Sequence, residues 1–134
     1  MIISGKNVTR TNSIDESLLG TTDLFATIAN LAGVNSSSIH DSKSFSSLLT
    51  TPSTNSIREY VYSEVGNDTN DDEYTIRNAS HKYILFADGS EALYNLQNDA
   101  LENTNLLNDN QLPLSTEDEA QLNLLKEAII NIKQ

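Results

Sequence analysis

Cysteine and tryptophan are both absent from this 134-residue sequence, which has only two prolines and five glycines. Without cysteine, no disulfide bond can form and no thiolate is available as a nucleophile or metal ligand. Hydrophobic residues make up 37% and aromatic residues 6% of the chain, so its core must be thin. No apolar run approaches the length of a transmembrane helix.

Positive charge is also scarce. Eight Lys and Arg residues stand against 19 Asp and Glu, which gives a formal net charge of −11. Such a surface repels nucleic acid and anionic membranes, so we expect neither as a partner. The start of the chain, Met1–Lys6, lacks a basic segment followed by an apolar stretch, so we expect no signal peptide here. Either the protein stays in the cytoplasm, or its true start is missing from this sequence.

The first third of the chain predicts one short strand and one helix. Met1–Ser4 is apolar and leads into a glycine turn, which favours a strand. Thr21 or Thr22 can cap a helix that Gly33 ends. Strand and helix have no sheet partner here, which indicates that they need a further segment to pack against. The apolar residues of the helix share one face: Leu24, Phe25, Ile28, Leu31 and Ala32.

The middle of the chain predicts a long connection followed by strands. Residues 35–56 are rich in Ser, Thr and Asn, with one apolar foothold at Phe45, Leu48 and Leu49. Segments near 60–62, 73–77 and 81–87 are β-prone and bounded by turn formers.

A hairpin follows these strands. Asp88-Gly89 predicts a two-residue type I′ turn between residues 84–86 and residues 93–96. Alternation places Tyr83 and Leu85 on one face, and Ile84 and Phe86 on the other. Which face meets the helix that follows is left open by the pattern.

A last helix completes the predicted fold. It begins at Ser115 or Thr116, with Asp118 or Glu119 at capping-box spacing. Its apolar stripe consists of Leu122, Leu125, Ile129 and Ile132, broadened by Leu124 and Ala128. The expected class is α+β: a small antiparallel sheet of three or four strands packed with a C-terminal helix.

Several short segments carry a family resemblance through their order and spacing. They are residues 22–33, 58–64, 74–77, 81–84, 91–96 and 99–106. Together they resemble the C-terminal portion of a sulfatase of the arylsulfatase-like type, in the alkaline phosphatase superfamily. The resemblance covers roughly residues 1–107. This chain departs from the family pattern at Ala100, where proline is usual, at Asn95, where aspartate is usual, and at Ser42, where glycine is usual.

The resemblance implies two parts. Residues 1–57 would be the end of the main α/β domain with a connecting loop, so that the early strand and helix are a remnant of that domain. Residues 58–134 would be the antiparallel-sheet-plus-helix subdomain. The complete enzyme would cleave sulfate esters of a sulfated carbohydrate with a calcium ion and a formylglycine, and would be periplasmic or secreted. The missing N-terminal sulfatase domain would be the partner of this chain.

The catalytic groups that the resemblance implies are not in this sequence. Formylglycine is made from Cys or Ser in a Cys/Ser-x-Pro-x-Arg context, but Thr50-Thr51-Pro52-Ser53-Thr54 has Thr in that place and no Arg. We therefore expect no catalytic residue, metal ligand or cofactor in this chain, and no activity for it alone. The alternative is a stand-alone, non-catalytic binding or interaction module derived from a sulfatase C-terminal subdomain.

Arg77, His81 and Lys82 form the only basic cluster and are the candidate substrate-binding residues. Family tails can lie near the mouth of the active cleft, so the resemblance implies contact with an anionic substrate. The alternative interpretation is a surface ladder that offsets nearby carboxylates.

One acidic loop has the spacing of a calcium site. Asp68, Asn70 and Asp72 alternate as calcium ligands do, but Glu73 stands where such a loop needs glycine. A solvated acidic loop is therefore the preferred interpretation.

Overall fold

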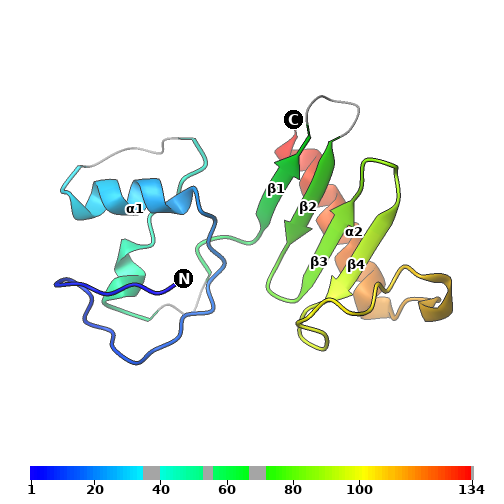
Figure 1. The fold of residues 1–134 in the computed structure, drawn as a ribbon, viewed down its shortest axis with the longest axis horizontal. Helices are drawn as coiled ribbons and strands as arrows, with labels where there is room; N and C mark the ends of the chain where they lie inside the picture. The colour runs from blue at the N-terminus through cyan, green and yellow to red at the C-terminus, as the bar shows by residue number, and fades with distance from the viewer. Residues whose placement is uncertain (35–39, 53–55, 67–71, 134) are drawn as a thin grey trace. The chain divides into compact units, whose positions relative to one another are not determined.

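The computed structural model describes residues 1–34, 40–52, 56–66 and 72–133. The chain divides into two compact units, Met1–Glu59 and Tyr60–Gln134 (Figure 1). The described parts contain helices in both units and one antiparallel sheet in the second, so the α+β class is confirmed. No helix within these parts is both long and apolar enough to cross a membrane.

The first unit contains helix α1 (Asp23–Leu31) and a short 3₁₀ helix, η1 (Ser46–Leu49). Gly33 ends α1 as predicted, with a positive φ of 80° that a side chain would disfavour. The Gly33 N–H donates to Asn30 O at 3.0 Å, and the Val34 N–H donates to Ala29 O at 2.9 Å. These two bonds are the Schellman pattern, which satisfies carbonyls that the helix end leaves free.

The predicted strand at Met1–Ser4 is wrong. These four residues are exposed and have no strand assignment, and every strand in the described residues lies in the second unit. A single strand without a neighbour has no ladder of hydrogen bonds to hold it extended.

Helix α1 turns its polar side inward. The predicted apolar residues do share one face of the helix, but that face is exposed at Leu24, Phe25, Ile28 and Leu31. The buried residues of the helix are Asp23, Ala26 and Thr27. The small core of the unit forms instead from Phe45, Leu48 and Leu49, the predicted foothold, with Val8, Leu19 and Ile57 packed against it.

A buried ion pair holds α1 in this orientation. Asp23 is fully buried, and its carboxylate accepts bonds from both Nε and a terminal NH₂ of Arg58, with the Nε bond at 2.8 Å. The backbone N–H groups of Gly20 and Lys43 donate to the same carboxylate at 2.7 and 2.8 Å. Burial raises the pKa of Asp23, but the bonds from Arg58, Lys43 and Gly20 outweigh it, so the pKa lies below its ordinary value.

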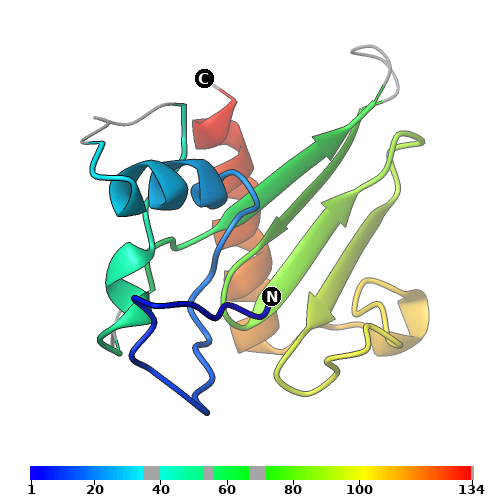
Figure 2. The same ribbon diagram turned by 60° about the vertical axis from the view of Figure 1, so that its left-hand side comes forward.

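The second unit is a four-stranded antiparallel meander covered on one face by α2 (Thr116–Ile132), as Figure 2 shows. Its strands, in sheet order, are β1 (Val61–Val65), β2 (Glu73–Arg77), β3 (His81–Leu85) and β4 (Glu91–Asn95). The sheet predicted from the β-prone segments is therefore confirmed, with four strands.

The hairpin between β3 and β4 is present, but its predicted turn type is wrong. Leu85 pairs with Glu91, and the Phe86 N–H donates to Ser90 O at 2.9 Å. Three residues, 87–89, therefore form the loop. Gly89 alone in it has a positive φ, of 83°. A type I′ turn needs positive φ at both central residues, whereas a three-residue loop needs it only at its last.

The core of the second unit settles which strand face meets the helix. Tyr83 and Leu85 pack on the α2 side with Leu93, Leu125 and Ala128. The predicted helix contacts Leu122 and Ile129 pack against this cluster while half-buried. The helix begins after Ser115 as predicted, because its Oγ accepts the Asp118 N–H at 3.1 Å.

We expect Leu125→Ala to lower the free energy of unfolding of the second unit by about 2–4 kcal/mol, since Leu125 is fully buried between helix and sheet. Urea denaturation followed by tyrosine fluorescence measures this. Ile130→Ala, at an exposed position of the same helix, is the control and should change stability by less than about 0.5 kcal/mol. Equal effects of the two substitutions would contradict the packing.

Candidate functional site

The three predicted site residues lie close in the sheet but on two faces. Arg77 is the ladder partner of Lys82, and such partners share a face. His81 precedes Lys82 in β3, so it points to the opposite face, toward α2. Arg77 is exposed and Lys82 half-buried, whereas His81 has no exposed surface. Only Arg77 and Lys82 are therefore placed where a ligand can reach them.

Tyr94 extends this pair into a row across the sheet face opposite α2, because it is the ladder partner of Lys82 in β4. We call these residues the Arg77–Lys82–Tyr94 row. The Lys82 Nζ lies 2.7 Å from Glu102 Oε2, so part of its charge is already balanced. Arg77 makes no ion pair with any described residue. The row can offer the Arg77 guanidinium to an anionic group and the aromatic surface of Tyr94 to the ring that carries this group.

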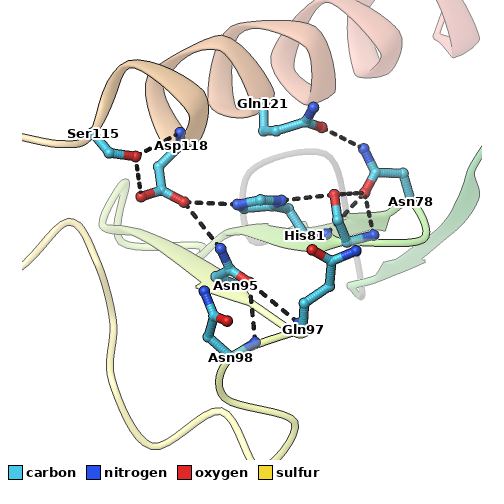
Figure 3. A network of polar contacts seen from close by, with 9 residues as sticks. Asn78, His81, Asn95, Gln97, Asn98, Ser115, Asp118 and Gln121 are labelled. Carbon is cyan, nitrogen blue, oxygen red and sulfur yellow. Dashed lines mark hydrogen bonds and ion pairs between the residues drawn. The ribbon is translucent and has the colours of Figure 1, made fainter.

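His81 is the centre of a buried polar network between the sheet and α2 (Figure 3). Its Nε2 lies 2.8 Å from Asp118 Oδ1, and its Nδ1 lies 2.8 Å from Ser80 Oγ. Each ring nitrogen thus has a polar partner. Because the ring is fully buried and both of its nitrogens have partners, the network holds β3 in position against α2.

Asp118 receives bonds from three other side chains. Ser115 Oγ donates at 2.6 Å and Asn95 Nδ2 at 3.2 Å, in addition to the bond with His81. Burial raises the pKa of Asp118, but these three bonds outweigh it, so the pKa lies below its ordinary value. Position in the first turn of α2 also favours the carboxylate, because the helix dipole is positive there.

Asn78 ties the turn between β2 and β3 to the same helix. Its Oδ1 accepts the N–H groups of Ser80 and His81 at 2.9 and 2.8 Å. Its Nδ2 donates to Gln121 Oε1 at 2.7 Å. Sequence reasoning predicted only a capping role for Asp118, since no spacing rule connects it with His81, 37 residues away.

The segment after β4 is also held by side chains that the family resemblance singled out. Asn105 Oδ1 accepts the Leu93 N–H at 3.0 Å, while its Nδ2 donates to Glu91 O at 3.1 Å. Asn105 therefore satisfies backbone groups along β4. Together with the Glu102–Lys82 ion pair, this bond pattern fastens residues 99–107 to the sheet.

The part of the chain that the structure describes brings no three His, Asp or Glu side chains together as a metal site. Thr50–Pro52 follows η1 as a turn, while Ser53 and Thr54 lie outside the described residues, as do Asp68 and Asn70 of the acidic loop. The described residues therefore offer neither a ligand set that fits a calcium ion nor a precursor for a formylglycine.

Residues 1–128 of this chain match the family model described as N-sulphoglucosamine sulphohydrolase, C-terminal. This match takes in both units. No protein in the curated collection of sequences matches.

Solved structures with the same fold include sulfatases. A 2-O GAG sulfatase matches with a TM-score of 0.75 and 22% identity, over 96% of this chain and 28% of its own. A sulfatase-like protein of Bacteroides thetaiotaomicron matches with a TM-score of 0.65 and 24% identity, over 81% of this chain and 24% of its own. A protein solved with its substrate D-glucosamine-2-N,6-O-disulfate matches with a TM-score of 0.61 and 20% identity, over 79% and 23%. This chain thus spans about a quarter of each.

The network around Asp118 leads to a pH dependence of stability. Because the folded pKa of Asp118 is lowered, its contribution is complete above the unfolded-state pKa of about 3.9 and is lost as the pH falls through the folded pKa. We expect Asp118→Asn to cost about 1–3 kcal/mol at pH 7 and to reduce the loss of stability below pH 4. Thermal unfolding between pH 2 and 7 measures both effects.

The control is Glu117→Gln, which removes an exposed carboxylate from the same helical turn without touching His81. If Asp118→Asn and Glu117→Gln give the same acid profile, the network around His81 does not stabilise the unit in the way described.

Proposed function

Because this chain belongs to the N-sulphoglucosamine sulphohydrolase C-terminal family, we propose that it is the C-terminal segment of a sulfatase-like sulfuric ester hydrolase, with a structural and cleft-shaping role. The observation that supports this proposal is that polar side chains of the second unit are hydrogen-bonded within that unit. His81, Asp118 and Asn105 are bonded within the second unit, and none of them is left free for chemistry.

We infer that the chain consists of parts of two different domains of the complete enzyme. Residues 1–57 are the end of the main α/β domain with its connecting loop, and residues 58–134 are the C-terminal subdomain. Support comes from the division of the chain between Glu59 and Tyr60. The exposed apolar side of α1 fits this proposal, because a helix at the end of a larger domain would pack that side against the rest of the domain.

We propose that the N-terminal sulfatase domain supplies the nucleophile and the metal ion. The complete enzyme would use a formylglycine and a calcium ion, both held by residues outside this chain. When bound, such an ion polarises the sulfate ester and stabilises developing negative charge. The residues of this chain would contribute shape and, through Arg77 and Lys82, positive charge at the edge of the substrate.

For the substrate, we propose a sulfated carbohydrate that reaches the Arg77–Lys82–Tyr94 row. One protein of the same fold was solved with a doubly sulfated glucosamine as its substrate. A guanidinium donates paired hydrogen bonds to an anionic group, and Arg77 is exposed to do so. His81 is adjacent to Lys82 in β3, but it is buried and would not contact the ligand.

The isolated chain should not hydrolyse sulfate esters. We expect no release of 4-nitrophenol from 4-nitrophenyl sulfate above the buffer rate, with calcium present, because no group on this chain matches the formylglycine motif. Turnover by the purified protein that disappears when a residue of this chain is substituted would overturn the proposed role.

Binding of sugar can be tested without turnover. Titration of the labelled chain with D-glucosamine-2-N,6-O-disulfate should shift the amide NMR signals around Arg77 and Lys82, with a dissociation constant that weakens as salt is added. Arg77→Ala with Lys82→Ala should weaken binding about 10-fold or more. Lys43→Ala, at an exposed lysine of the first unit, is the control. Unchanged binding by the double variant, or no shifts in the wild-type chain, would contradict the substrate proposal.

A further inference from the structure

Glu102 places a carboxylate beside the Arg77–Lys82–Tyr94 row. Its Oε2 lies 2.7 Å from Lys82 Nζ, and the side chains of Lys82 and Glu102 are 25% and 33% exposed. Lys82 is the ladder partner of both Arg77 and Tyr94, so the carboxylate lies next to the middle of the row. The sheet face opposite α2 therefore carries a guanidinium, an ammonium, an aromatic ring and a carboxylate together.

The backbone of Glu102 is held in a conformation that a side chain disfavours. Its φ is 58°, in the left-handed region. Asp99 fixes this loop, because its carboxylate accepts the Thr104 N–H at 2.8 Å and Asn103 Nδ2 at 3.0 Å. The Asp99 carbonyl also accepts the Glu102 N–H at 3.1 Å. Strained backbone that the surrounding structure holds in place is common at ligand sites, and it puts the Glu102 carboxylate in position before any ligand arrives.

We propose that Glu102 is a specificity-determining residue, which makes the row prefer a sulfated amino sugar with an unsubstituted amine to one whose amine is itself sulfated. This inference rests on the proposed function and deepens it, since it states which sulfated sugars the row accepts. In that proposed function the nucleophile and the metal ion lie outside this chain. The row therefore selects on a group of the sugar other than the sulfate ester that is cleaved.

The opposite charges of the row fit the opposite charges of such a sugar. Arg77 is exposed and makes no ion pair with a described residue, so its guanidinium is open to a sulfate group. An aliphatic amine carries a proton at about pH 6, and the Glu102 carboxylate attracts the resulting ammonium. The ring of Tyr94 offers its surface to the sugar ring that joins the two groups.

A second sulfate in the place of the amine meets repulsion instead. It brings negative charge close to Glu102, and like charges at short range weaken binding. Lys82 can compensate only by exchanging its 2.7 Å contact with Glu102 for a contact with the ligand. Residues 60–134 contain four basic and fourteen acidic residues, and their net charge of −10 adds to the repulsion. Selectivity thus comes from a repulsive contact as well as an attractive one.

The alternative is that Glu102 only fastens residues 99–107 to the sheet through Lys82. A fastening role predicts that loss of the carboxylate lowers stability without changing which sugars bind. The selectivity ratio separates the two roles. We define it as the dissociation constant of D-glucosamine-2-N,6-O-disulfate divided by that of D-glucosamine 6-sulfate.

The test titrates the full 134-residue chain with these two sugars at about pH 6 and low salt, and follows the amide NMR signals of the row. We expect the wild-type chain to bind the monosulfate at least about 5-fold more tightly than the disulfate. Glu102→Gln should lower the selectivity ratio at least about 5-fold. Glu119→Gln, at an exposed position of α2, removes the same charge from the unit on the other side of the sheet and should leave the ratio unchanged.

A third sugar makes the test independent of how the variant folds. N-acetyl-D-glucosamine 6-sulfate has no charge on its nitrogen, so the wild-type chain should bind it at least about 5-fold more weakly than the free amine. Equal binding of all three sugars that Arg77→Ala weakens overturns the role of Glu102 and leaves the proposed sugar site standing. A selectivity ratio that Glu102→Gln leaves unchanged has the same meaning. Failure of the chain to bind any of the three sugars overturns the sugar site and this inference together.

Discussion

The buried carboxylate of Asp23 determines how the first unit is built. It accepts bonds from the Arg58 side chain and from the Gly20 and Lys43 backbone, so it joins three separate segments at the start of α1. Leaving such a buried charge without its partner costs about 3–5 kcal/mol. Turning α1 over would also break the bonds of the Ala26 N–H with Ser42 Oγ and of the Phe45 N–H with Thr27 Oγ1. The polar side of α1 therefore faces inward, and the apolar side remains for another surface.

The second unit is also organised by a carboxylate that bonds to a distant residue, but its partners differ. Asp118 also lies in the first turn of a helix, and it also bonds to a residue far away in the sequence, His81. Here the helix turns its apolar side inward, because the sheet presents Ile76, Tyr83 and Leu93 to receive it. No buried side-chain nitrogen or oxygen in the described residues lacks a partner. The second unit therefore closes its own core, whereas the first unit satisfies its polar groups and leaves apolar surface outside.

These differences explain which features the sequence could predict. The Ser115 cap, the Gly33 stop and the strands of the second unit are decided by neighbouring residues, so their patterns are sufficient. The direction in which α1 faces is not decided by neighbouring residues. A hydrophobic stripe shows which side of a helix is apolar but not what covers that side. The contact of His81 with Asp118 depends on how the sheet meets the helix, which no local spacing encodes. The loop before β4 follows from the pairing of Leu85 with Glu91 rather than from Asp88-Gly89 alone.

The negative charge of the second unit limits how strongly it can attract a sulfated sugar. Its net charge of −10 repels a sulfated sugar, and the ion pair with Glu102 already balances much of Lys82. Arg77 thus acts against the field of its own unit, and its attraction for a sulfate is short-ranged and sensitive to salt. In the proposed enzyme, the strong positive charge that sulfate ester cleavage requires would come from the catalytic portion. Under the proposed function, the Arg77–Lys82–Tyr94 row would orient one end of a sugar that is already held elsewhere, and it would select among substrates without providing most of the affinity.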